Sequence, residues 1–121
     1  IPAEPLFRSS LAASKRKSDG HFNGIAPNAD LVVVKAFGGD GSGTYADVIR
    51  GIDWAVANKD DYGIRVLNLS FSAPLRSLYW EDPLNQAAMA AWEAGIVVVV
   101  SAGTLLTAFG LGDAAAIAAG R

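Results

Sequence analysis

The sequence predicts an α/β fold: three layers, with a parallel sheet that carries helices on both faces. Three short apolar runs rich in β-branched residues, at residues 31–34, 64–67 and 96–100, alternate with two segments of helical period. Strand, helix, strand, helix, strand is a βαβαβ unit, and right-handed crossovers make its three strands parallel. Two of the runs are nearly continuous rather than alternating, which is typical of strands covered on both faces.

Two helices are expected between these strands, because apolar residues recur there at i, i+3, i+4 and i+7. In the first helix Asp47 lies early and Lys59 late, as the helix dipole favours. The second begins with Asp82 as N-cap and Pro83 at the first helical position, and Gly95 ends it. The expected apolar stripes are Tyr45, Val48, Ile49, Ile52, Ala55 and Val56 in the first helix, and Leu84, Ala87, Ala88, Ala91 and Trp92 in the second.

Composition excludes several classes of function. A length of 121 residues with 51% hydrophobic and 18% charged side chains is typical of one ordered hydrophobic core. A net charge of −2 offers nucleic acid no basic footprint, and the longest apolar run, residues 96–100, is too short to span a bilayer. We therefore expect neither nucleic acid nor membrane as a partner. The first residue is Ile1 rather than Met, so we expect a chain that was processed or cut from something longer.

Few side chains are candidates for catalysis or metal binding. The absence of cysteine excludes disulfides, thiolate metal sites and cysteine nucleophiles. Lys15-Arg16-Lys17 lies in a Ser-rich stretch and is interpreted as a solvated loop. His21, the one histidine, lies among Gly and Asn and is interpreted as an exposed turn residue. The carboxylates form no pair suited to acid/base chemistry, and we predict no metal site.

Ligands of open parallel sheets bind beyond the carboxyl ends of the strands, which directs attention to residues 38–43, 70–81 and 101–104. Gly41-Ser42-Gly43-Thr44-Tyr45-Ala46 fits the loose dinucleotide fingerprint G-x-G-x-x-A. That fingerprint also needs a carboxylate at the end of the next strand, and a phosphate loop needs a lysine. Both are missing here, so a nucleotide-binding α/β domain remains the weaker alternative to a plain strand-to-helix turn.

Five segments, taken in order, resemble the subtilisin-like (subtilase) serine peptidase family. The similarity covers residues 10–103, and the implied fold is the incomplete βαβαβ core of a subtilisin-like catalytic domain. Its activity is peptide-bond hydrolysis, and family members are usually secreted. The segments are Asn23-Gly24-Ile25-Ala26-Pro27-Asn28-Ala29, Gly41-Ser42-Gly43-Thr44-Tyr45, Ile52-Asp53-Trp54-Ala55, Asn68-Leu69-Ser70-Phe71-Ser72 and Val99-Val100-Ser101-Ala102-Gly103.

The resemblance also implies a binding site for a peptide or protein substrate in extended conformation. Gly41, Ser42 and Gly43 correspond to a strand that pairs with substrate backbone, and Tyr45 to a wall of the pocket for the fourth residue before the scissile bond. The opposing strand and one side of the primary specificity pocket complete this implied site. Their residues are Ser70, Phe71 and Ser72 for the strand, and Ser101, Ala102 and Gly103 for the pocket.

The family's Asp/His/Ser triad has no counterpart in these residues. Phe7 occupies the position of the histidine, His21 lies outside the motif, and Thr104 stands where the oxyanion-hole Asn belongs. The resemblance leaves calcium open, but no Asp/Asn loop has suitable ligand spacing. The fragment is therefore expected to be inactive alone; a non-catalytic peptide-binding or interaction fragment is the alternative.

Three segments are expected along the chain. Residues 1–9 match nothing in the family, residues 10–104 form a partial peptidase domain, and residues 105–121 form an Ala/Gly-rich tail. Because composition changes at both junctions, we expect foreign or frame-shifted sequence at the two ends. Read in this way, the middle segment carries whatever function the chain has.

Overall fold

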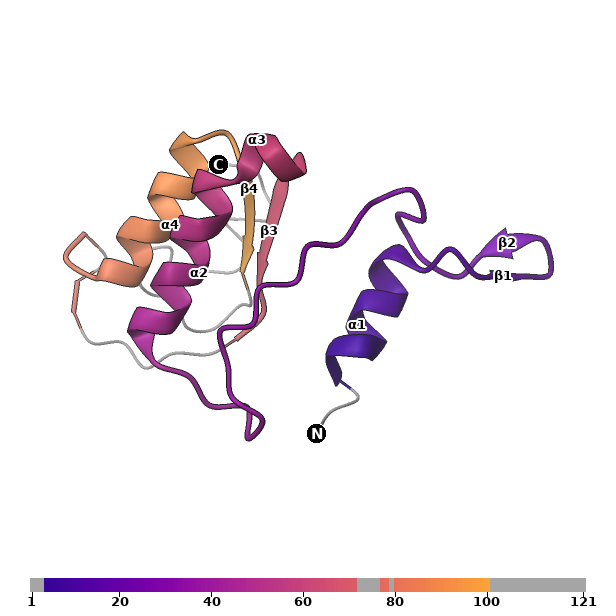
Figure 1. Ribbon diagram of the computed structural model, residues 1–121, viewed down its shortest axis with the longest axis horizontal. Helices are drawn as coiled ribbons and strands as arrows, with labels where there is room; N and C mark the ends of the chain where they lie inside the picture. Colours follow the sequence, from indigo (N-terminus) through magenta and orange to yellow (C-terminus); the bar gives the residue numbers. More distant parts are fainter. Residues whose placement is uncertain (1–3, 72–76, 79, 101–121) are drawn as a thin grey trace. The chain divides into compact units, whose positions relative to one another are not determined.

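The computed structural model describes residues 4–71, 77–78 and 80–100 (Figure 1). The chain forms two compact units, Ile1–Thr44 and Tyr45–Arg121. Among the described residues, no helix combines the length and the apolar character that crossing a membrane requires. The predicted boundaries near residues 9 and 104 remain predictions.

The first unit contains a helix and a short hairpin. Helix α1 (Glu4–Ala13) has Pro5 in its first turn, where the missing N–H costs no hydrogen bond. Strands β1 (Lys17–Ser18) and β2 (His21–Phe22) pair antiparallel. Asp19 and Gly20 between them have φ of 52° and 84°, as a two-residue type I′ turn requires. The stretch interpreted as a loop is therefore a hairpin, and its Asp-Gly dipeptide was the overlooked signal.

The carboxyl end of α1 is closed by the chain that returns from this hairpin. Backbone N–H groups of Ile25 and Ala26 donate to the α1 carbonyls of Leu11 and Ala12, at 3.0 and 2.8 Å. These bonds satisfy acceptors that a helix end otherwise leaves without a partner. Gly24 is buried at the closest approach. The motif that begins at Asn23 therefore has a structural task, which is to cap α1.

Residues 31–34, the first predicted strand, form no strand in the structure. Their side chains are exposed, with 78% of Val33 accessible. A strand gains its backbone hydrogen bonds only from a neighbour, and within the described residues of the first unit this run has none. The predicted parallel pairing is confirmed for the second and third runs, and the place of the first run in the sheet stays a prediction.

The second unit confirms the α/β class. Helix α2 (Tyr45–Ala57), the short helix α3 (Lys59–Tyr62), strand β3 (Val66–Leu69), helix α4 (Pro83–Glu93) and strand β4 (Val97–Val100) follow in order. Strands β3 and β4 are parallel and adjacent, joined through α4, as the βαβ pattern predicted. Lys59 begins α3 instead of ending α2.

The core of this unit lies between α2, α4 and the sheet. The stripe predicted for α4 is buried at four of its five positions, since Trp92 is 61% exposed. Alanines dominate that stripe, so α4 approaches α2 closely and the large Trp92 ring falls outside the contact. The buried apolar residues are Val48, Ile52, Ala55, Leu69, Leu84, Ala87, Ala88, Ala91 and Ile96.

Only one face of the two-stranded sheet is covered within the described part of the second unit. Val66 and Val97 are paired in register and are 58% and 53% exposed, and Val99 is 47% exposed. Leu69, which points the other way, is buried. The strands therefore alternate in burial, although their continuous apolar sequence predicted cover on both faces.

Candidate functional site

The carboxyl ends of β3 and β4 are level, because Leu69 pairs with Val100. Figure 1 shows that α2 and α4 begin at this same end of the unit. Open α/β sheets bind ligands at such an edge, where strands end and helices begin. The described residues at this edge include Ser70 and Phe71 after β3, Tyr45 at the start of α2, and Asp82 before α4.

Asp82 caps α4 as the sequence predicted, and it also reaches α2. Its Oδ1 accepts hydrogen bonds from the backbone N–H groups of Leu84 and Asn85, at 2.8 and 3.2 Å. Its Oδ2 accepts the phenolic hydrogen bond of Tyr45, at 3.2 Å. The side chain is almost fully buried, with 3% of the residue exposed. The Asp82 carboxylate thus hydrogen-bonds to the first turn of both helices.

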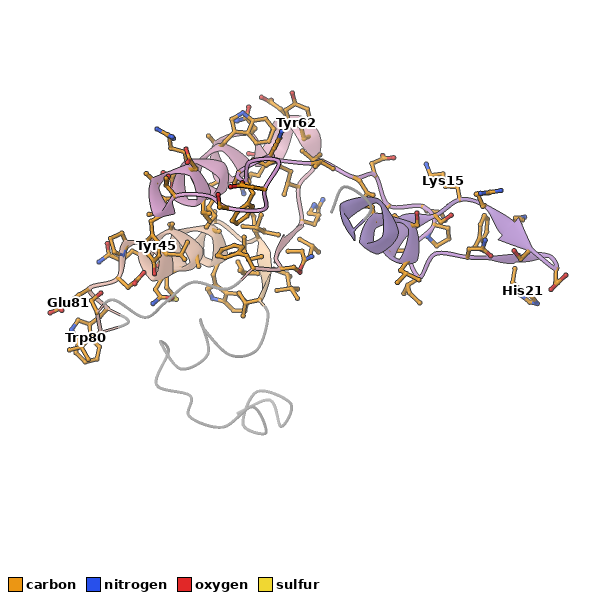
Figure 2. All side chains as sticks on the ribbon, turned by 90° about the horizontal axis from the view of Figure 1, so that it is seen from below. Lys15, His21, Tyr45, Tyr62, Trp80 and Glu81 are labelled. Carbon is orange, nitrogen blue, oxygen red and sulfur yellow. The ribbon has the colours of Figure 1, made fainter. Side chains whose placement is uncertain are left out.

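Tyr45 is half-buried in the first turn of α2, while Trp80 and Glu81 project outward from the loop before α4 (Figure 2). Trp80 is 56% exposed, and its carbonyl accepts a hydrogen bond from Gln86 Nε2 at 3.0 Å. The loop is therefore tied to α4 by its backbone, while the Trp80 ring remains accessible. Nothing in the sequence pattern had indicated Trp80.

The segment after β3 is described as far as Phe71. Ser70 is exposed, and its Oγ donates to Asn68 Oδ1 at 3.0 Å, while Phe71 is half-buried. Asn68 therefore bonds its neighbouring loop side chain at the strand end. The remaining predicted site residues, Ser72, Ser101, Ala102, Gly103 and Thr104, lie outside the described residues.

Residues 38–42 form a closed turn. Gly41 N–H donates to the Gly38 carbonyl at 3.1 Å, and Gly38 N–H donates to the Ser42 carbonyl at 2.8 Å. This is the pattern of a three-residue loop whose last position is left-handed. Gly41 has φ of 79°, which explains glycine there. The segment expected to pair with substrate is thus a turn followed by extended chain, and not a strand of the sheet.

The side chain of Asp40 stabilises this turn. Its carboxylate accepts hydrogen bonds from the Ser42 hydroxyl at 2.7 Å and from the Ser42 N–H at 3.1 Å. These bonds, the hydroxyl's first, lower the pKa of Asp40 below its ordinary value of 3.8. A carboxylate that occupies the loop donors disfavours a phosphate at the same place. The geometry therefore argues against the nucleotide-binding alternative.

The backbone at Gly43, just beyond this turn, packs closely against Ala36 and Phe37. A Cβ added to Gly43 would lie 2.7 Å from both the Ala36 carbonyl and the Phe37 ring. Ser42 uses its N–H and its carbonyl inside the turn. Among the described residues, the Gly41 carbonyl and the Gly43 N–H have no backbone partner. Backbone polar groups that another chain can pair with therefore flank Ser42.

His21 lies on β2, where it pairs with Ser18, and its side chain is exposed (Figure 2). The same hairpin places Lys17 Nζ 4.6 Å from the centre of the Phe22 ring. Neither Asp nor Glu hydrogen-bonds to His21 within the described ranges. In the same part of the chain, no three His, Asp or Glu side chains are grouped as a metal site would require.

Comparison with known proteins adds an independent finding. A sequence profile of the Subtilase family matches residues 9–112. Serine protease AprX of Bacillus subtilis (strain 168) is 40% identical over 98 residues, which cover 77% of this chain and 22% of that protein. Subtilisin DY of Bacillus licheniformis is 41% identical over 80 residues, covering 66% of this chain and 26% of that protein. The chain thus spans about a quarter or less of these relatives' length.

Proposed function

This chain belongs to the subtilase family, and we propose that it carries substrate-binding segments of a subtilisin-like serine endopeptidase without the catalytic Asp, His and Ser. On this proposal it binds a protein or peptide substrate in extended conformation and does not cleave it alone. The observation that carries the proposal is the pair of backbone groups, the Gly41 carbonyl and the Gly43 N–H, that flank Ser42.

An extended peptide binds by adding a strand, so it needs alternate backbone groups along one side of a segment. Ser42 directs its own groups into the turn, which orders the segment and leaves the groups of its neighbours for a ligand. The absence of a side chain at Gly41, beside which nothing lies within 4 Å, lets a second backbone come close. These features favour peptide binding over a plain connecting loop.

The second unit supports side-chain recognition by itself. Tyr45 offers a half-buried ring held at its hydroxyl, and Phe71 is likewise half-buried after β3. Aromatic side chains supply large apolar contact areas and lose little conformational entropy on binding. We propose that Tyr45 forms a wall for one substrate side chain and that Ser70 and Phe71 offer a second segment to substrate backbone. Ser72 is included in that second segment.

We propose that the chain does not cleave peptides alone, because a serine nucleophile needs a base beside it. A serine hydroxyl attacks a carbonyl only when an adjacent base removes its proton. The one histidine of the 121 residues, His21, lies on an exposed hairpin, where no carboxylate among the described residues of the first unit hydrogen-bonds to it. Thr104 stands at the proposed oxyanion position, and its side chain is too short to replace an Asn amide donor. We further propose that Ser101, Ala102 and Gly103 line a specificity pocket.

Two measurements on the full 121-residue chain test this proposal. The first is binding of fluorescein-labelled extended hexapeptides, followed by anisotropy, for wild type and for two variants. Gly43→Pro removes the proposed N–H donor, whereas Gly43→Ala adds the same crowded Cβ and keeps the N–H. We expect saturable binding that Gly43→Pro weakens more than Gly43→Ala does; equal binding by the two variants would refute the proposed backbone pairing.

The second measurement is hydrolysis of a broad fluorogenic peptide library, with labelling by a serine-directed phosphonate. We expect neither turnover nor labelling, in wild type and in His21→Ala. Turnover by wild type that disappears in His21→Ala would make His21 a base and would overturn the inactivity. Peptide binding without turnover is the result that this proposal requires.

A further inference from the structure

We propose that Asp82 is a positioning residue: its buried carboxylate fixes the ring of Tyr45 and thereby sets which substrate side chain is accepted beside that ring. This inference rests on the proposed function, in which Tyr45 contacts substrate. It adds a residue to that function that does not itself touch the peptide. Its starting point is the hydrogen bond between two residues that lie 37 positions apart in the chain.

The Asp82 carboxylate is itself immobile. It accepts two backbone N–H groups of the first turn of α4, at 2.8 and 3.2 Å, and only 3% of the residue is exposed. The positive end of the α4 dipole further stabilises a carboxylate at this place. An acceptor held in this way cannot rotate to follow the hydroxyl of Tyr45. The fixed carboxylate therefore determines the position of the Tyr45 hydroxyl.

Tyr45 is consequently held at two points. Tyr45 is the first residue of α2, a helix that packs on α4 and buries Val48 and Ile52. Its hydroxyl is 3.2 Å from Asp82 Oδ2 at the other end of the side chain. With both ends fixed, the ring loses the rotamer changes that an exposed first-turn tyrosine makes freely. Its half-buried surface then presents one constant flat face.

A constant aromatic face distinguishes ligands by size and shape. A peptide with an aromatic or large aliphatic side chain at this face gains contact area, whereas one with Ala leaves the face uncovered. A ring free to rotate would fold over a small side chain and would reduce this difference. We therefore assign to the Tyr45–Asp82 pair a preference for large apolar side chains at one position of an extended peptide.

The test uses the full chain and hexapeptides based on Ala, with a single Phe placed in turn at each position. The measured quantity is the ratio of Kd between the all-Ala peptide and the best Phe peptide. Three variants disturb the pair: Tyr45→Phe removes the hydroxyl, Asp82→Ser removes the acceptor because its side chain is too short to reach Tyr45, and the third combines both. Ser is as good an N-cap as Asp, so α4 keeps its cap in the second variant.

Asp47→Asn is the matched control, because it removes the same formal charge from the first turn of α2 without touching the Tyr45 hydroxyl pair. Tyr45→Phe tests the same hydrogen bond from its other end should Asp82→Ser fail to fold. Folding of each variant is checked by circular dichroism. A purely structural role of Asp82 would change stability and leave the Kd ratio alone.

We expect the wild-type ratio to fall about three- to tenfold in Tyr45→Phe and in Asp82→Ser, and no further in the double variant. Asp47→Asn should keep the wild-type ratio. A ratio unchanged by both single substitutions, or two effects that add, would overturn this inference while the proposed function stands. Failure of the wild-type chain to bind any of the peptides would overturn the proposed function and this inference together.

Discussion

Replacing Gly24 by Ala tests how the first unit holds together. A Cβ at this position would lie 2.3 Å from the Ser14 nitrogen and 2.9 Å from the Ser14 carbonyl oxygen. Real Cβ atoms do not approach closer than 3.0 Å, and both contacts are backbone atoms that cannot rotate away. The returning chain must therefore move away from α1 by about 0.7 Å, the difference between 3.0 and 2.3 Å.

That displacement affects three hydrogen bonds to the end of α1. The Gly24 N–H bond to Ser14 is already 3.3 Å long and breaks, while the bonds of the Ile25 and Ala26 N–H groups, at 3.0 and 2.8 Å, lengthen to the limit of hydrogen bonding. A typical intramolecular hydrogen bond contributes about 1 kcal/mol net, so we expect a loss of about 2–3 kcal/mol. Local opening of this unit should become correspondingly easier.

Native-state hydrogen exchange of the Ile25 and Ala26 amides measures this loss directly. The expected destabilisation corresponds to exchange that is faster by about 30- to 160-fold. Gly39→Ala is the control, because nothing lies within 4 Å of a Cβ added there. Unchanged protection of both amides in Gly24→Ala would show that the close approach to Ser14 does not determine this structure.

Two further predictions concern single charged groups. Lys59 Nζ donates a hydrogen bond to the Ala94 carbonyl at the end of α4, at 2.8 Å. Lys59→Met should therefore lower the free energy of unfolding, measured by denaturant titration, by about 1 kcal/mol. Lys35→Met is the control and should leave this free energy unchanged, because Lys35 is exposed. Asp40 has a lowered pKa in the folded chain, so its contribution to stability is present above pH 3.8 and is lost as the pH falls through the lowered value. In Ser42→Ala, a carboxyl-carbon NMR titration should show the pKa of Asp40 return toward 3.8, because the hydroxyl hydrogen bond is removed.

The second unit was largely predictable from the sequence, because local chemistry and helical period agree there. Asp82 before Pro83 indicated the start of α4, and both helices follow from their apolar stripes. Gly95 ends α4 with φ of 85°, as expected for a left-handed residue after a helix. Such signals act within a few residues of one another, so they can be recognised without knowledge of the tertiary structure.

The hairpin at residues 17–22 was predictable in principle and was missed. Asp19-Gly20 is a strong turn signal, but its flanking strands have two residues each and show no apolar alternation. The Lys and Ser residues of that stretch are typical of a solvated loop, which is what the sequence predicts there. The correction matters for His21, which lies on a strand instead of in a turn.

Residues 31–34 show how far composition alone can lead. Their composition is as typical of a strand as that of β4, and yet only β4 is one. Strand propensity describes how well side chains fit a pleated surface, whereas the backbone needs a partner on at least one edge. Strand β4 has β3 beside it, joined by a helix that packs on the same sheet. A four-residue apolar run alone carries no information about whether such a neighbour is present.

The bond between Tyr45 and Asp82 could not have been predicted from the sequence at all. Each residue had a sufficient local explanation, Tyr45 as the first member of a helical stripe and Asp82 as an N-cap. Their contact depends on the crossing of α2 and α4, which the alanine-rich stripe of α4 sets by allowing a close approach. An Asp at the N-cap has two carboxylate oxygens, and only Oδ1 of Asp82 accepts hydrogen bonds from the N–H groups of α4. The second oxygen is available for a tertiary contact, and here it determines where a proposed substrate-binding ring is held.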